Sequence, residues 1–276
     1  MDKIAKQVIK LAYQEDIGKG DITTDSIIPK SQKGKALIVA KSDGILSGIE
    51  AVKYAFKLAS PKIEIVFHIG DGKKFASGII IASIKGPAHG ILKGERLALN
   101  LLSHLSGVAS LTAKFVEQVK GTQADILDTR KTTPGLRSLE KQAVLHGGGK
   151  NHRMGLYDMV LIKDNHIASA GSVNKALEKF INAKCKVEIE ISDFEQLESA
   201  LQYSPDIIML DNFNTRQLAR AVWIIKSKKP KIKIEVSGGV TLKNIKAKAK
   251  TGIDYISIGA LTHTVSAIDF SMRNTA

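Results

Sequence analysis

The sequence lacks the features that mark several large classes of protein. Its 276 residues include a single cysteine, Cys185, which excludes a disulfide within the chain and a cysteine cluster for a metal. No apolar run approaches the roughly 18 residues that span a bilayer. The charged opening segment, residues 1–16, has a helical pattern and not that of a signal peptide. We therefore expect a cytoplasmic protein without membrane segments.

Acidic residues and aromatic residues are also scarce beside the basic ones. The chain has 41 Lys and Arg against 27 Asp and Glu, a formal net charge of +14, and only 5% aromatic residues. Such an excess can indicate nucleic-acid binding, but the lysines are dispersed, and their densest runs, 227–233 and 243–250, fit exposed helix ends and loops. Few aromatic side chains are available to stack on bases. We expect no nucleic-acid partner, and a positive field that helps to collect anionic substrates.

The spacing of apolar residues changes near residue 124. Before it, helical patterns and strand-like runs alternate irregularly, which indicates an α+β arrangement. The expected helices there are 2–13, 49–58 and 90–120, and the expected strands are 36–40, 45–48, 63–68 and 79–84.

After residue 124, short apolar runs alternate regularly with helical segments. This alternation predicts parallel strands joined by right-handed crossovers, and the six strands fall short of the eight of a full barrel. The expected strands are 125–127, 159–162, 187–191, 207–210, 232–236 and 255–258. The expected helices include 136–144, 173–181, 194–201, 216–225 and 242–248.

Basic residues gather at the carboxyl ends of the first two of these strands. Arg130 and Lys131 follow the first strand and Lys163 follows the second, with His152 and Arg153 in the segment between them. Ligands bind at this edge of parallel sheets, because the loops after the strands converge there. Arg presents forked donors to carboxylates and Lys a point charge. The pattern predicts an anionic substrate with several carboxylates or phosphates.

Acidic residues lie at the next two strand ends. Alternation in VEIEIS places Glu188 and Glu190 on one face of their strand, and Asp211 directly follows the strand 207–210. These carboxylates either form ion pairs with the basic cluster or contact sugar hydroxyls and a hard cation such as Mg²⁺, which takes oxygen ligands.

Small residues end the last two strands, at Ser237-Gly238-Gly239 and at Gly259-Ala260. Glycine lets backbone N–H groups approach a phosphate, and a following helix N-terminus adds a favourable dipole. The alternative is a plain turn from strand to helix at each position. Phosphate sites at the last strands of parallel barrels are common, which favours the first interpretation for the pair.

Three motifs carry a resemblance to a known family. The stretches DTRKTTPG at 128–135, GGGKNHRMGLYDMVLIKDNHI at 147–167 and GERLALNLLSHLSGVAS at 94–110 resemble those of quinolinate phosphoribosyltransferase, and the similarity extends from residue 15 to residue 263. The resemblance implies an N-terminal α+β sandwich domain over 1–106, followed by an incomplete (β/α) TIM-like barrel over 107–265. A C-terminal tail, 266–276, is expected to return to the first domain.

The activity that the resemblance implies is transfer of phosphoribose from phosphoribosyl pyrophosphate to quinolinate. Decarboxylation accompanies the transfer, and the products are nicotinate mononucleotide, pyrophosphate and CO₂, a step of de novo NAD synthesis. Mg²⁺ is expected with phosphoribosyl pyrophosphate. The resemblance also implies a homodimer or higher homo-oligomer in which Arg96 reaches the site of a neighbouring subunit.

Three of the residues that match the family's site are expected to be catalytic. Lys131 is expected to contact pyrophosphate, and Glu190 and Asp211 are expected to contact the sugar and stabilise its charge. Whether these two carboxylates bind Mg²⁺ directly or contact only ribose hydroxyls stays open. The full set expected to bind substrate is Arg96, Thr129, Arg130, Lys131, His152, Arg153, Lys163, Glu190, Asp211, Ser237, Gly238, Gly239, Gly259 and Ala260.

Other functions remain possible on the sequence. A related phosphoribosyltransferase acting on nicotinate or another acceptor, including the molybdenum-associated paralogues, is the nearest, although the intact TTPG and KNHR stretches favour quinolinate. A barrel lyase that forms a Schiff base on Lys163 is a different class, and it needs an apolar pocket or neighbouring cations that lower the pKa of its lysine. A nucleic-acid-binding protein is the third alternative.

Overall fold

The computed structural model describes residues 1–275. They form two compact units. The first contains Met1–Ala113, Lys131–Gly148 and the chain from Ala260 onward, and the second contains Lys114–Arg130 and Gly149–Gly259. This division differs from the expected bounds of 1–106 and 107–265, because the segment after Arg130 packs on N-terminal residues; Gly135, for example, lies against Val8. No helix among residues 1–275 has the length and apolar character needed to cross a membrane.

The first unit opens with the expected amphipathic helix. Helix α1 runs over Lys3–Ile17, four residues longer at its end than expected, and buries Ala5 and Ile9. Asp2 caps it by accepting a 2.7 Å hydrogen bond from the N–H of Ala5, as N-cap carboxylates do. A short helix, α2, follows over Ile22–Ile27.

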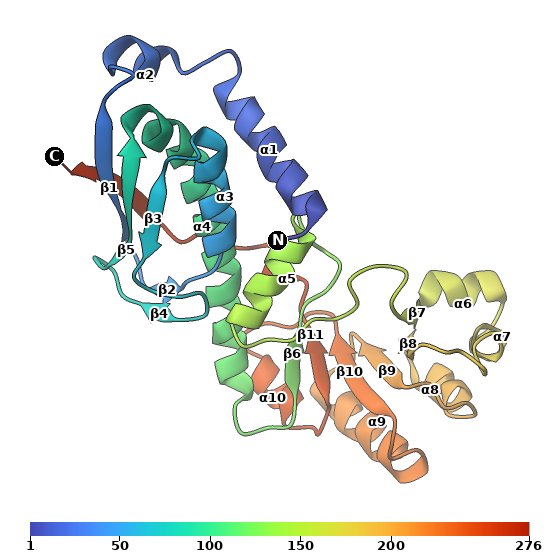
Figure 1. Ribbon diagram of the computed structural model, residues 1–276. Helices are drawn as coiled ribbons and strands as arrows, with labels where there is room; N and C mark the ends of the chain where they lie inside the picture. The colour runs from blue at the N-terminus through green and yellow to red at the C-terminus, as the bar shows by residue number, and fades with distance from the viewer. Residues whose placement is uncertain (276) are drawn as a thin grey trace. The chain divides into compact units, whose positions relative to one another are not determined.

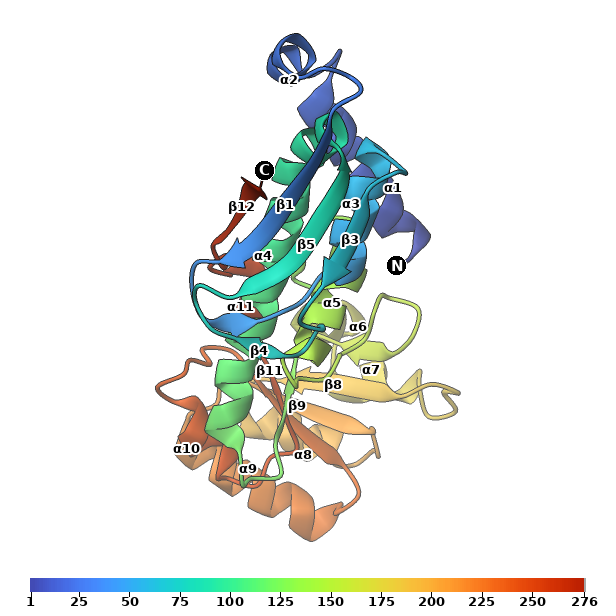
Figure 2. The same cartoon turned by 60° about the vertical axis from the view of Figure 1, so that its left-hand side comes forward.

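An antiparallel sheet forms the centre of this unit. Its strands lie in the order β12-β1-β5-β3 within residues 1–275, and α3 and α4 lie against one face (Figure 2). Alternate residues of β1, such as Ala36 and Ile38, are buried because a pleated strand turns every second side chain to the same face. The strands are β1 Lys33–Ala40, β3 Glu64–Phe67, β5 Ile80–Pro87 and β12 Phe270–Thr275, a small pair is formed by β2 Gly44–Ile45 and β4 Lys74–Phe75, and the covering helices are α3 Ile49–Ala59 and α4 Ala88–Val119.

The C-terminal strand belongs to this same sheet. Strand β12 pairs antiparallel with β1 in a register that runs from Ala40↔Phe270 to Lys35↔Thr275. The tail of the chain therefore completes an edge of the N-terminal sheet. Helices α5 Arg137–His146 and α11 Ala260–His263 also lie in this unit.

The second unit is built on a parallel sheet with the strand order β6-β11-β10-β9-β8-β7 in the described chain (Figure 1). All five pairings are parallel, so the fold class expected from the sequence, an incomplete α/β barrel after an α+β domain, is confirmed. The strands are β6 Asp125–Leu127, β7 Val160–Ile162, β8 Val187–Ile191, β9 Ile207–Asp211, β10 Lys233–Ser237 and β11 Tyr255–Ser257.

Helices connect these strands and cover the sheet. Their starts are set by polar caps: Asp193 accepts from the N–H of Gln196 at 2.7 Å, and Asn214 and Gln217 form a reciprocal capping box. The apolar centre includes Ile189, Ile208 and Ile234, which are fully buried on three adjacent strands. The helices are α6 Asp164–Ala170, α7 Val173–Glu178, α8 Phe194–Ala200, α9 Thr215–Lys228 and α10 Ile245–Ala249.

Candidate active site

The second unit carries most of the expected site residues at the carboxyl edge of its sheet, where the six parallel strands end. The remaining three, Arg96, Lys131 and Ala260, lie in the first unit. Those of the second unit are Thr129, Arg130, His152, Arg153, Lys163, Glu190, Asp211, Ser237, Gly238, Gly239 and Gly259.

An ion pair joins the ends of β7 and β8. Lys163 Nζ lies 2.7 Å from Glu190 Oε2, and both side chains are partly exposed. Lys163 directly precedes α6, and its backbone N–H donates a 2.9 Å hydrogen bond to His166 Nδ1, which fixes the start of that helix. The pair thus brings together a cation expected to bind quinolinate and a carboxylate expected to contact the sugar of phosphoribosyl pyrophosphate.

Two guanidinium groups lie near each other at this edge. Partial burial, followed by the positive charge of Arg130, lowers the pKa of Arg153. Arg153 is oriented by a 3.2 Å hydrogen bond from Nη1 to the carbonyl of Met159, just before β7. Two cations held close together in a partly buried place favour an anionic ligand, because such a ligand relieves their repulsion.

The ends of β9 and β10 form a polar turn around Asp211. Ser237 Oγ donates to Asp211 Oδ1 at 3.0 Å, and Asn212 Nδ2 donates to Asp211 Oδ2 at 2.7 Å. A Cβ atom at Gly238, whose φ is +82°, would lie only 2.1 Å from Asn212 Oδ1, so glycine is required there. At Gly239 φ is +58°, but a Cβ atom would meet nothing within 4 Å. The turn is therefore closely packed at Gly238 and open at Gly239.

The loop that carries His152 and Arg153 is tied to the end of β6. Asp128, fully buried, accepts a 2.9 Å hydrogen bond at Oδ1 from the N–H of His152. The backbone of Lys150 accepts from Asp128 and donates to Ile126, so the loop extends beside the strand end. Two motifs that are about twenty residues apart in the chain are adjacent here, and Asp128, which the sequence did not single out, connects them.

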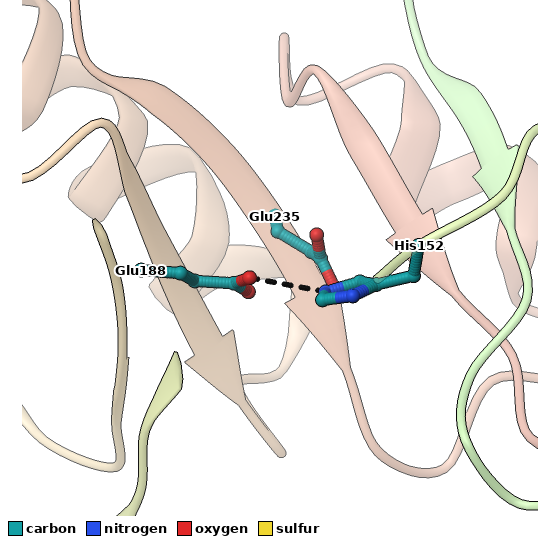
Figure 3. Close-up of side chains that lie close together, drawn as sticks. All are labelled: His152, Glu188 and Glu235. Atoms are coloured by element: carbon teal, nitrogen blue, oxygen red, sulfur yellow. Dashed lines mark ion pairs between the residues drawn. The ribbon is translucent and has the colours of Figure 1, made fainter. Parts of the chain in front are cut away.

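His152 extends from this loop toward Glu188 and Glu235 of the sheet, and the three side chains form a cluster (Figure 3). His152 Nε2 is 3.0 Å from Glu188 Oε2 and 3.5 Å from Glu235 Oε1, and both glutamates are fully buried. The Ser257 hydroxyl donates to Glu235 Oε1. The imidazole expected to face the substrate thus contacts carboxyl groups of the protein itself.

The two glutamates have strongly perturbed acidities. Burial raises the pKa of Glu188 to about 8, against the opposing charges of Arg153 and Lys163. Burial, reinforced by Glu188, also raises the pKa of Glu235 to about 8. Alternation indicated Glu188 from the sequence, but Glu235 was missed; the signal available was a single acidic residue inside the apolar run of β10.

In the first unit, Lys131 lies exposed in a loop that is held at several points. Its carbonyl accepts a 2.6 Å hydrogen bond from Thr262 Oγ1, and two residues further on the N–H of Thr133 donates to Glu140 Oε2 at 3.1 Å. Glu140 is fully buried, and its Oε1 lies 2.7 Å from His104 Nε2. Arg96 is exposed on α4.

Comparisons with known proteins agree with the family resemblance of the sequence motifs. The family model for the quinolinate phosphoribosyl transferase N-terminal domain matches residues 21–106, and that for the C-terminal domain matches residues 108–273. A Bacillus subtilis protein, named as a probable nicotinate-nucleotide pyrophosphorylase (carboxylating), is 44% identical over 98% of this chain and 93% of its own length.

Solved structures are similar over the same extent. The nicotinate-nucleotide pyrophosphorylase of Francisella tularensis has a TM-score of 0.92 and 37% identity, and the alignment covers 99% of this chain and 96% of that one. The nicotinate-nucleotide pyrophosphorylase of Ehrlichia chaffeensis has a TM-score of 0.92 and 38% identity, with 98% of each chain covered. The resemblance found in the sequence motifs is confirmed, and the chain belongs to the quinolinate phosphoribosyltransferase family.

Proposed function

We propose that this chain transfers phosphoribose from phosphoribosyl pyrophosphate to the ring nitrogen of quinolinate, with decarboxylation. Family membership over the whole chain supports the reaction. The observation that carries the residue assignments is the 2.7 Å contact of Lys163 with Glu190, because it joins a cation suited to the acceptor with a carboxylate suited to the sugar.

The acceptor is bound by positive charge. Quinolinate carries two adjacent carboxylates, and the second unit offers Arg130, Arg153 and Lys163 at neighbouring strand ends. Forked guanidinium donors fit planar carboxylates, and the lysine adds a point charge. The proximity of Arg130 to Arg153 supports this role, since the pair is stabilised when an anion lies between them.

The donor is bound through its hydroxyl and phosphate groups. Glu190 and Asp211 accept from ribose hydroxyls, with Ser237 holding the Asp211 carboxylate. The ends of β10 and β11, at Gly238, Gly239, Gly259 and Ala260, receive the 5′-phosphate through backbone N–H groups. Thr129 contributes a hydroxyl beside Arg130. Lys131 contacts the pyrophosphate.

The carboxylates of Glu190 and Asp211 also fit Mg²⁺. They are oxygen donors, which Mg²⁺ prefers, but in residues 1–275 they belong to no close group of three His, Cys, Asp or Glu ligands. Such a site suits an ion that keeps most of its waters and enters with the phosphates of its substrate. When bound, Mg²⁺ neutralises charge on the leaving pyrophosphate.

The chemistry then needs little acid–base help from the protein. The bond from ribose C1 to pyrophosphate breaks as the bond from C1 to the quinolinate nitrogen forms. Cations stabilise the leaving pyrophosphate, and the carboxylates of Glu190 and Asp211 stabilise the positive charge that develops on the sugar. The carboxylate next to the new pyridinium nitrogen leaves as CO₂. Its electron pair stays on the ring carbon, stabilised by that nitrogen, and takes up a proton.

The complete site requires a second subunit in this proposal. Arg96 lies in the first unit, and we assign it to the acceptor site of the neighbouring chain, as the family resemblance implies. The assembly is then a homodimer or a higher homo-oligomer with shared sites.

The test is release of CO₂ from carboxyl-labelled quinolinate by the purified protein. Release is expected only when phosphoribosyl pyrophosphate and Mg²⁺ are both present, and nicotinate offered instead should give no nucleotide. Product from nicotinate alone would assign the chain to the related transferases. The Schiff-base alternative has no support here, because Lys163 Nζ lies against a carboxylate in a partly exposed place and not in an apolar pocket.

A further inference from the structure

Both ring nitrogens of His152 lie close to polar groups of this chain. Nδ1 accepts a 2.7 Å hydrogen bond from the backbone N–H of Arg153, and Nε2 faces the carboxyl groups of Glu188 and Glu235. A backbone N–H can only donate, so Nδ1 must carry a lone pair. In a neutral imidazole the other nitrogen then carries the hydrogen. The hydrogen-bond pattern therefore assigns His152 as the Nε2–H tautomer.

The glutamates are well placed to hold that tautomer. The imidazole is only 7% exposed, its Nε2 lies 3.0 Å from Glu188 Oε2, and neither Glu188 oxygen accepts a hydrogen bond within residues 1–275. Glu235 is anchored by the Ser257 hydroxyl at Oε1, the same oxygen that faces His152. The acceptors come from β8 and β10, two strands of the rigid sheet, whereas His152 lies in a loop without regular structure.

We propose that Glu188 and Glu235 are positioning residues that hold His152 as a neutral Nε2–H imidazole, and that this imidazole fixes the backbone of Arg153. The role of Arg153 toward the acceptor rests on the function proposed above. The positive charge of the acceptor site then comes from Arg130, Arg153 and Lys163, and His152 supplies geometry instead of charge. This revises the expectation from the sequence, which counted His152 among the potential cations.

The same three residues could in principle hold a metal, since one ligand atom of each lies within 4.8 Å of the others. A metal held by the two carboxylates would also be bound by Nε2, because this is the ring nitrogen that faces them. It would therefore need the lone pair of Nε2. The Arg153 N–H already uses the lone pair at Nδ1, so the neutral ring has none left at Nε2. The hydrogen-bond pattern therefore favours a purely organic cluster.

The tautomer can be measured directly in the free enzyme. Protein labelled with the heavy nitrogen isotope in histidine is studied by long-range proton–nitrogen NMR at neutral pH, and the His152 signals are assigned by their loss in His152→Gln. One protonated and one unprotonated ring nitrogen are expected, with the proton on Nε2. A ring protonated on both nitrogens, a proton on Nδ1, or a shift on adding Zn²⁺ would overturn the proposal.

Variants then test the positioning role. Glu188→Leu removes the acceptor and should raise the KM for quinolinate about tenfold or more, since small misplacements of a binding group are costly. The KM for phosphoribosyl pyrophosphate should change much less. Glu188→Gln keeps an acceptor oxygen and should retain both the tautomer and most of the affinity. The matched control is Asp254→Asn, at the amino end of β11, whose carboxylate pairs with Lys226 and Lys233.

The outcomes separate this inference from the proposed function. If Glu188→Leu and Asp254→Asn raise the quinolinate KM equally, or if Glu188→Gln is as impaired as Glu188→Leu, the positioning role is wrong. If the wild type does not turn over quinolinate, the proposed function fails, but the NMR measurement still decides the state of His152.

Discussion

Lys163 and Glu190 meet at 2.7 Å across the ends of two adjacent strands, β7 and β8. Each residue lies at the carboxyl end of its strand, so the parallel sheet itself sets their separation. In the proposed reaction the lysine serves the acceptor and the carboxylate serves the sugar. In that reaction the two substrates would meet at this pair of side chains, and a change to either residue would alter the other.

This coupling predicts non-additive kinetics. Lys163→Met and Glu190→Gln should each lower kcat/KM for quinolinate, and the double variant should be little worse than the poorer single one, because residues that act as a unit lose their effect together. Steady-state kinetics with saturating phosphoribosyl pyrophosphate measures this. The matched control is the exposed pair Lys85 and Glu64, 2.9 Å apart in the first unit, whose loss should leave the rate unchanged. Additive losses from Lys163 and Glu190 would contradict the coupling.

Arg130→Ala should weaken quinolinate binding specifically. Loss of a charge-assisted hydrogen bond costs roughly 1.5–3 kcal/mol, whereas binding of phosphoribosyl pyrophosphate should change much less. Titration calorimetry with each substrate gives both values. If phosphoribosyl pyrophosphate binds more weakly to the variant and quinolinate does not, Arg130 belongs to the phosphate site instead.

Two neighbouring glycines should respond differently to the same substitution. In Gly238→Ala the new methyl group would collide with Asn212 Oδ1, which also disturbs the amide that donates to Asp211. We expect at least a tenfold rise in the Kd of phosphoribosyl pyrophosphate. In Gly239→Ala the methyl group meets open space, so the main cost is backbone strain of about 1–2 kcal/mol in stability.

Binding assays and thermal denaturation of both glycine variants provide the comparison. An equal loss of donor affinity in the two proteins would show that the packing around Asn212 does not matter for binding. A large loss in Gly239→Ala alone would show that a methyl group at this position, and not the packing around Asn212, hinders the phosphate.

The buried carboxyl group of Glu235 predicts a pH-dependent stability. Burial and Glu188 raise its pKa from 4.5 to about 8 in the folded protein. Below the unfolded pKa both states hold the proton, and the contribution to stability is full. As pH rises toward 8 the unfolded state releases the proton first, so the wild type loses stability. Glu235→Gln lacks this titration, so its free energy of unfolding should increase relative to that of the wild type as pH rises toward 8.

The expected relative gain between about pH 5 and about pH 8 is on the order of 3 kcal/mol, since one pKa unit corresponds to about 1.4 kcal/mol. Urea denaturation at several pH values measures the difference in unfolding free energy. A difference that stays constant over this range would mean that Glu235 is ionised in the folded protein.

The sequence predicted those parts of the site that follow directly from strand ends. Strands β6 and β8 have the expected bounds, because each is a short apolar run with clear breaks, and this places Arg130 and Glu190 at one edge. Helix α6 was not expected, because none of its residues is buried and its pattern is therefore weakly amphipathic. The contact of Asp128 with the His152 loop was not predictable, because that loop has no period that fixes its position.

The most distinctive prediction concerns Arg96, which lies exposed on α4 in the N-terminal unit. If this arginine completes the site of a neighbouring chain, a single chain cannot form a working site, and activity should depend on assembly. The side chain then acts in trans, while Lys131 acts in the site formed by its own chain. Two inactive variants, one at each position, can therefore compensate for each other.

The experiment mixes Arg96→Ala and Lys131→Ala under conditions that allow subunits to exchange. In each mixed dimer one site receives both lesions and the other receives neither, by the two-fold symmetry of the pair. Random pairing makes about half of the dimers mixed, so activity should recover to roughly a quarter of the wild type. Exchange is verified by tagging one variant and detecting mixed dimers by mass. If exchange occurs without recovery, either Arg96 acts within its own chain, so that each site of the mixed dimer keeps one lesion, or the two sites of a dimer do not work independently.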